Sequence, residues 1–136
     1  MKLVVDASVA VKWIHSEPGS REAKALVNPA TELIAPDFMP VEIANVLWRL
    51  VRTKQMKAHE VPALLDLLSR AMSHLESSGR LLPRALALAI ALDHPIYDCL
   101  YIALAERESA ILVTDDRRLF ALGSKLKAVK IRHLMA

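Results

Sequence analysis

Acidic residues stand directly after two short apolar segments that predict buried β-strands. Asp6 follows residues 3–5, and Asp115 and Asp116 follow residues 111–113 after a single threonine. In an open parallel sheet, ligands bind outside the carboxyl ends of the strands, and right-handed crossovers bring those ends to one edge. We therefore expect these carboxylates to converge although they lie far apart in the sequence.

Two further acids are placed to join them. Glu42 lies in a predicted helix that begins just after another strand, and Asp98 lies in the first turn of the helix before residues 110–113. Carboxylates gathered in one crevice repel each other, so without a cation at least one of them would take up a proton. Carboxylate oxygens suit Mg2+ or Mn2+, and such ions can activate water and orient a phosphodiester. The four positions together predict a metal site for phosphodiester chemistry.

The cysteine, histidine and glycine residues do not indicate a different kind of active site. Cys99 is the only cysteine, which excludes an intramolecular disulfide and a thiolate metal cluster. The five histidines lack the paired helical spacing of a zinc site, and the three glycines form no phosphate-binding loop. Because no histidine is in view as its partner, Cys99 is expected to be a small packed residue.

The composition indicates one domain spanning residues 1–136. Hydrophobic residues make up 54% of the chain and charged residues 24%, which suits a compact core. The formal charge of +3 permits nucleic acid binding without arguing for it. The longest apolar run, residues 85–92, is too short to cross a bilayer, and no secretory leader is evident. We expect a soluble cytoplasmic protein with no membrane association.

Strands and helices alternate along the sequence. Strands are predicted at residues 2–5, 33–35 and 110–113, with a last one near 128–131. Helical segments lie between them, and the break at Asp93-His94-Pro95 separates two of these helices. This alternation predicts an α/β fold with a parallel sheet covered by helices on both faces.

The helix that carries Glu42 is predicted in more detail. Asp37 is placed to cap its start, and Pro40 falls in its first turn, where proline is tolerated. The residues at helical spacing along its expected apolar face are Val41, Ala44, Trp48 and Val51.

Four segments, taken together, resemble a known family. The first is residues 3–13, LVVDASVAVKW, and the second runs from Pro36 through Glu42 to Asn45-Val46-Leu47. The third is residues 97–105, YDCLYIALA, and the fourth is residues 112–119, LVTDDRRL. In this order they resemble the motifs of PIN-domain nucleases of the VapC toxin type, over essentially the whole chain.

The resemblance implies a fold, an activity and partners. The fold would be a three-layer α/β/α sandwich around a five-stranded parallel sheet. The activity would be that of a magnesium-dependent endoribonuclease, the toxin of a type II toxin–antitoxin pair, hydrolysing RNA by metal-activated water. A small cognate antitoxin would cover the crevice and bind nearby apolar helices, and the chain would form a homodimer.

The resemblance also assigns roles to individual residues. Those implied as catalytic and metal-binding are Asp6, Glu42, Asp98 and, two residues after the threonine, Asp116. Those implied to orient these carboxylates are Ser8, Asn45, Thr114 and Asp115, and Asp115 is also the other candidate for the place of the fourth acid. Among the basic residues, Lys12 and Arg117 lie nearest the acids in sequence and are predicted to contact RNA phosphates.

Three other functions stay open at this point. A phosphoryl-transfer protein with an acidic pocket fits poorly, because Ser8 stands where a phosphatase of the haloacid-dehalogenase type needs its second aspartate. A PIN-like module that binds RNA or protein without cutting keeps the same acids. A DNA-cutting nuclease would also use them, because a carboxylate–metal site acts on phosphodiesters in general.

Overall fold

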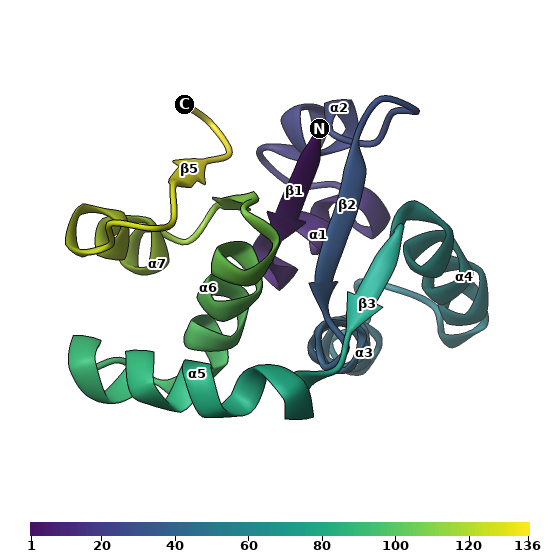
Figure 1. The fold of residues 1–136 in the computed structure, drawn as a ribbon. Helices are drawn as coiled ribbons and strands as arrows, with labels where there is room; N and C mark the ends of the chain where they lie inside the picture. Colours follow the sequence, from purple (N-terminus) through teal and green to yellow (C-terminus); the bar gives the residue numbers. More distant parts are fainter.

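A five-stranded, all-parallel sheet forms the centre of the protein, in the strand order β3-β2-β1-β4-β5 (Figure 1). The computed structural model describes all 136 residues. The strands are β1 (Lys2–Val5), β2 (Glu32–Pro36), β3 (His74–Glu76), β4 (Ile111–Thr114) and β5 (Ile131–His133). The five-stranded parallel sheet expected from the resemblance is confirmed.

Seven α-helices and two short 3-10 helices connect the strands. The α-helices are α1 (Ala7–Ile14), α2 (Ser20–Ala25), α3 (Met39–Arg52), α4 (Val61–Ala71), α5 (Ser78–Leu92), α6 (Ile96–Glu108) and α7 (Arg117–Ala121). The 3-10 helices are η1 (Ala58–Glu60) and η2 (Leu122–Lys125). Helix α1 packs with α2, α3 and α4, whereas α6 lies across β1, β2 and β4 and is covered by α5 (Figure 1).

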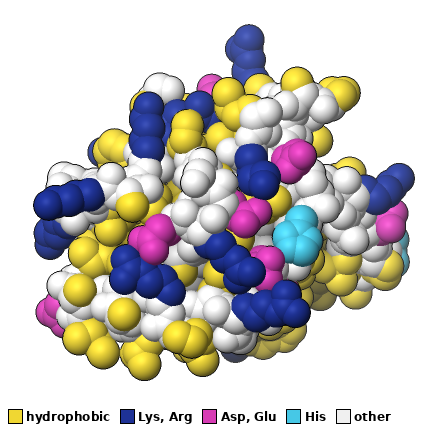
Figure 2. Space-filling view, viewed as in Figure 1, with side chains coloured by type: hydrophobic (Ala, Val, Ile, Leu, Met, Phe, Trp, Pro, Cys, Tyr) yellow, Lys and Arg dark blue, Asp and Glu magenta, His cyan; other side chains and the backbone are white.

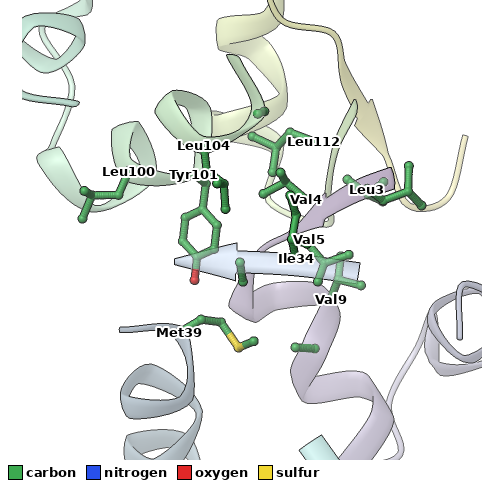
Figure 3. Close-up of a cluster of buried hydrophobic side chains, with 14 of the residues drawn as sticks. Leu3, Val4, Val5, Val9, Ile34, Met39, Leu100, Tyr101, Leu104 and Leu112 are labelled. Carbon is green, nitrogen blue, oxygen red and sulfur yellow. The ribbon is translucent and has the colours of Figure 1, made fainter. Parts of the chain in front are cut away.

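The core lies on the two central strands and α6. All of Leu3, Val4 and Val5 are buried, as are Leu112 and Val113 of the neighbouring strand. Strands covered on both faces lose alternation and read as continuous apolar runs, which explains why these segments were visible in the sequence. Figure 3 shows these side chains packed with residues of α6, among them Tyr101, whose hydroxyl points toward the helix of Met39.

The strand order reverses between β1 and β4. From β1 the chain runs to β2 and then β3 on one side, and it returns through α5 and α6 to β4 on the other side. Open α/β sheets bind ligands at such a reversal, outside the carboxyl ends of the strands. The residues that follow β1 and β4 therefore lie at the edge where a ligand site is expected.

Three details of the sequence prediction were wrong. Strand β3 was not predicted, because its three residues include a single apolar side chain, Leu75, and it lies at the edge of the sheet. The last strand begins at Ile131, where residues 128–131 were expected. Asp37 does not cap α3; its carboxylate accepts hydrogen bonds from the backbone N–H and hydroxyl of Ser78, at the start of α5.

The buried face of α3 also differs from the predicted one. Its buried side chains are Met39, Ile43, Leu47 and Leu50. Val41 and Trp48, which were expected to face the core, are 69% and 55% exposed. Both sets repeat at helical spacing, so the sequence pattern alone does not choose between the two faces.

None of the helices is by itself long and apolar enough to cross a membrane. Only α5 and α6 taken together reach the required length and hydropathy, and they are bent by 117° at their junction. Most of α6 is buried inside the protein.

Candidate active site at the carboxyl ends of β1 and β4

Asp6 lies at the strand reversal and begins α1. Its carboxylate accepts a hydrogen bond from the Val9 N–H at 3.2 Å, which caps the helix. The Ser8 hydroxyl donates to one carboxylate oxygen at 2.6 Å, and the Thr114 hydroxyl, from the end of β4, donates to the other at 2.5 Å. The two hydroxyl contacts predicted for Ser8 and Thr114 are therefore present.

The environment of Asp6 opposes its charge. Only 5% of the residue is exposed, and the pKa of its carboxyl is raised to about 6, with burial as the largest cause. The hydrogen bonds from Ser8, Thr114 and the Val9 N–H lower that pKa, and the negative charge of Asp98 raises it further. Because burial and the charge of Asp98 destabilise the ionised Asp6 carboxylate, a cation bound nearby would stabilise it.

Glu42 reaches the same region from α3. The Tyr101 hydroxyl, on α6, donates a hydrogen bond to the Glu42 carboxylate at 2.7 Å. Burial raises the pKa of Glu42, the bond from Tyr101 opposes that rise, and the charge of Asp98 adds to it. The Tyr101 ring itself is buried, so its hydroxyl needs a partner inside the protein, and Glu42 provides it.

Asp98, in the first turn of α6, is the acid whose charge affects both Asp6 and Glu42. Its negative charge contributes to the raised pKa of both Asp6 and Glu42. His94, at the end of the loop before α6, contacts one Asp98 carboxylate oxygen through Nε2 at 2.6 Å. Because one Asp98 oxygen has a fixed partner, the orientation of the carboxylate is restricted.

The two acids after β4 have structural partners of their own. Asp116 caps α7, accepting hydrogen bonds from the N–H groups of Arg118 and Leu119, and its own N–H donates to the Thr114 hydroxyl. Asp115 forms an ion pair with Lys12 at 3.1 Å. Through Thr114, Asp116 is connected to Asp6, and its role as the fourth acid stays a prediction.

Asp115 is tied to the site by its backbone. Its N–H donates to the Ser8 hydroxyl at 2.9 Å, and that hydroxyl holds Asp6. This contact agrees with a positioning role for Asp115, which stays a prediction.

Lys12 does not have the surroundings expected of a phosphate contact. The residue is 5% exposed, and its ammonium group lies 2.7 Å from Glu17 and 3.1 Å from Asp115. Burial alone would lower its pKa, but the two acids outweigh burial and raise that pKa. We correct the prediction: Lys12 neutralises and holds Asp115, and it has no open side from which to contact RNA.

Two other predicted residues lie on the surface. Asn45 is exposed on α3 and makes no hydrogen bond with a carboxylate, so its orienting role stays a prediction. Arg117 is exposed at the start of α7, and its contact with RNA phosphate stays a prediction. Cys99 is buried, and burial raises the pKa of its thiol to about 11, as expected of a packed residue and not of a nucleophile.

The residues fit a hard cation by their chemistry more than by their present spacing. Asp6, Glu42 and Asp98 supply only oxygen donors, and the negative charge of Asp98 is felt by both of the others. No three acidic, histidine or cysteine side chains lie close enough together to ligate one ion as they stand. The acids therefore form an electrostatic cluster whose side chains must turn inward to bind metal.

Comparison with known proteins assigns the family. The chain matches the family model described as "PIN domain" over residues 3–125. The chain belongs to the PIN-domain family. This PIN domain is 36% identical over 121 residues to Ribonuclease VapC3 of Pyrobaculum aerophilum, covering 88% of this chain and 92% of that protein.

Solved structures share the PIN-domain fold. The crystal structure of PAE2754 from Pyrobaculum aerophilum has a TM-score of 0.67 at 23% identity, covering 96% of this chain and 92% of its own. VapBC2 from Rickettsia felis, solved with a DNA fragment from its promoter, has a TM-score of 0.64 at 14% identity and covers 98% of both chains.

Sequence reasoning missed two residues of the site, His94 and Tyr101. His94 stands four residues before Asp98 but lies in the loop before α6, so helical spacing does not account for their contact, and nearness in the sequence is the only signal for it. Tyr101 follows Asp98 by three residues, but its partner Glu42 is 59 residues away in the sequence. No local signal points to that contact.

Proposed function

We propose that this chain is an endoribonuclease that hydrolyses RNA phosphodiesters with Mg2+, with Mn2+ as an alternative ion. One observation carries the proposal: the buried Asp6 carboxylate at the strand reversal, with a raised pKa and with the Asp98 charge beside it. Membership of the PIN-domain family and the identity with a VapC ribonuclease support it.

The proposed division of labour follows the contacts. Asp6 and Asp98 would be the principal ligands of the ion, and Glu42 would bind or position it through water or act on the attacking water. Asp116 would complete the site with its Oδ2, because both of its helix-cap hydrogen bonds are accepted by Oδ1. The ion would supply charge that activates water and offsets the charge of the phosphate. Ser8, Thr114, Tyr101 and His94 position the acids through the hydrogen bonds described above.

The experiment is cleavage of labelled single-stranded RNA by the pure protein with Mg2+, with EDTA, and with Mg2+ restored. We expect cleavage that stops in EDTA and returns with Mg2+, and no cleavage of a DNA strand of the same sequence. Cleavage that persists in EDTA would exclude the metal mechanism, and equal cleavage of DNA would exclude the assignment to RNA.

A catalytically silent module that binds RNA or protein is the alternative function. It is favoured by the spacing of the acids, because no three of them stand at ligand distance. Under that alternative the protein would bind RNA and leave it intact at every Mg2+ and Mn2+ concentration, so the same experiment separates the two.

As part of the same proposal, the chain is the toxin of a cytoplasmic toxin–antitoxin pair. A cleft of about 250 Å3 between α1, α2 and α4 offers an apolar surface for a small antitoxin. The residues that line it are Trp13, Lys24, Val27, Leu67 and Ala71. Co-expression with the product of a short neighbouring reading frame should give a stable complex without ribonuclease activity, and an active, uncomplexed protein would contradict the pairing.

We further propose that the protein forms a homodimer through α5. Leu82, Leu86 and Ile90 follow one another at four-residue spacing and are 49%, 52% and 75% exposed. Figure 2 shows hydrophobic side chains along the edge where α5 lies in Figure 1. Exposed apolar stripes of this kind mark protein–protein contacts.

The dimer is tested by light scattering of the protein as it elutes from a sizing column. Leu86→Glu would place a charge in the two-fold interface, and we expect it to raise the dimer Kd by roughly a hundredfold. Ala87→Glu adds the same charge to an exposed neighbour outside the stripe and should leave the dimer intact. A monomeric parent, or equal effects of the two variants, would contradict this interface.

A further inference from the structure

The positive charge of the chain is concentrated at its carboxyl end. None of the 15 acidic residues follows Asp116, whereas six of the 18 Lys and Arg residues do. These six are Arg117, Arg118, Lys125, Lys127, Lys130 and Arg132. The first 116 residues therefore carry a net charge of −3, and the last 20 residues carry +6.

These cations are free to meet a ligand. All but Arg132 are exposed, and Arg132 is partly buried. The nine ion pairs of the protein use none of the six. Figure 2 shows Lys and Arg side chains over the side of the molecule where α7 lies in Figure 1. Unpaired cations in this density attract a polyanion.

Two cavities lie in the same region, and Phe120 lines both. The first, of about 650 Å3, is lined by Asp115, Arg117, Phe120, His133, Met135 and Ala136. The second, of about 630 Å3, is lined by Phe120, Ala121, Gly123, Ser124, Val129, Lys130 and Ile131. The Phe120 ring thus stands between two hollows, each of which contains one of the free cations.

The Phe120 ring is available for stacking. The residue is 42% exposed, although α7 is otherwise anchored by the fully buried Leu119 next to it. Its aromatic neighbour, His133, meets it edge to face, with ring centroids 5.6 Å apart and planes inclined by 79°. Whichever ring presents its edge, His133 covers at most one of the two faces of the Phe120 ring, and the other face is free of His133.

The first cavity adjoins the acidic cluster. Asp115 lines the cavity, and its N–H donates to the Ser8 hydroxyl that holds Asp6. A strand of nucleic acid with a phosphate at the acids would therefore have this cavity beside it.

We propose that α7, η2 and β5 form a track for single-stranded RNA, in which Phe120 stacks on a base next to the scissile phosphate. Arg117 and Lys130 contact the phosphates on either side of that base. A single strand is required because a base inside a duplex offers no free face, whereas stacking on an exposed aromatic ring needs one. The choice of RNA as the polymer rests on the proposed function.

The test measures binding in EDTA, so that the probe is not cut. The probe is a fluorescent single-stranded RNA of about ten nucleotides, within the range that single-strand-binding sites cover. We expect Phe120→Leu, which keeps an apolar side chain but removes the aromatic face, to weaken binding about tenfold. Trp48→Leu removes another exposed aromatic residue, on α3, and should leave the Kd unchanged.

A second arm identifies the stacked base. Replacing one nucleotide at a time by an abasic ribose should weaken binding to the parent at one position about tenfold, and that penalty should vanish in Phe120→Leu. Arg117→Gln and Lys130→Gln should each lower the slope of log Kd against log salt by about one.

Three results would overturn the proposal. These are unchanged binding by Phe120→Leu, an abasic penalty of the same size in the parent and in Phe120→Leu, and a probe displaced by duplex RNA or by a Glu-rich peptide as readily as by single-stranded RNA. Thermal unfolding of Phe120→Leu confirms that the variant is folded. A protein that binds RNA in this Phe120-dependent way but never cuts it would contradict the proposed nuclease and leave the track in place.

Discussion

Asp98→Asn should abolish RNA cleavage, with a loss of about a thousandfold or more in the single-turnover rate. Asp98 is the acid whose charge acts on both Asp6 and Glu42, so its removal takes away the centre of the cluster. The amide keeps the size of the side chain and can still bond to His94, so the fold and the start of α6 should be preserved. The measurement is cleavage of labelled RNA at saturating Mg2+, beside a thermal unfolding curve of each protein.

A matched control stands five residues earlier. Asp93 ends α5 in the left-handed conformation, with φ of 51°, which asparagine adopts readily. Asp93→Asn removes the same charge from the same connection without touching the cluster, and its cleavage rate should equal that of the parent. If Asp98→Asn cuts RNA as fast as Asp93→Asn, the role assigned to Asp98 is wrong.

Asp6→Asn should stabilise the protein at pH 8 in the absence of divalent metal. The pKa of Asp6 is raised to about 6 in the folded chain, above its ordinary value of 3.8, so the folded state holds a proton that the unfolded state releases. Between these two values the parent loses stability as the pH rises, by up to about 3 kcal/mol in total. Asparagine has no charge to desolvate and caps helices as well as aspartate does, and the hydroxyl that meets its amide nitrogen turns to accept a hydrogen bond in place of donating one.

The expected signature is a difference that depends on pH. Without metal, the Tm of Asp6→Asn should exceed that of the parent by about 10 °C at pH 8, and the gap should close near pH 4. Saturating Mg2+ should raise the Tm of the parent, because the ion binds the folded state. It should leave the Tm of Asp6→Asn unchanged, because this variant lacks the carboxylate that would hold the ion. Asp66→Asn, at an exposed acid of α4, should follow the parent throughout. A parent that is more stable than Asp6→Asn at pH 8 without metal would contradict the desolvated state of Asp6.

The central part of the fold was predictable because strands that are buried on both faces consist of consecutive apolar residues. β1 and β4 are covered on both faces, and each appears as an apolar run that ends at a polar residue. The edge strand β3 gave no such signal, since His74 and Glu76 flank its one apolar residue. Helix α3 has apolar residues on two faces, and only packing in the folded chain decides that Ile43 is buried and Trp48 is exposed.

The residues of the site likewise fall into those that the sequence predicts and those that it does not. Asp6 and the pair Asp115–Asp116 were predictable because strand ends must converge in a parallel sheet, whereas the roles of Ser8 and Thr114 followed only from the family resemblance. The environment of Lys12 was not predictable, because its partner Asp115 lies 103 residues further along the chain. No local sequence pattern distinguishes a buried lysine from one on the surface. The contact between Tyr101 and Glu42 was hidden for the same reason.

The Tyr101–Glu42 hydrogen bond has a mechanical consequence. Tyr101 lies one turn after Asp98 on α6, so a single stiff phenol fastens the Glu42 carboxylate to the helix that also bears Asp98. A shift of α6 would therefore act on Asp98 directly and on Glu42 through Tyr101. The third acid, Asp6, is held at the end of β1 by its hydrogen bond with Thr114. The distance of Asp6 from the other two acids therefore depends on how α6 sits against β1, which it contacts directly.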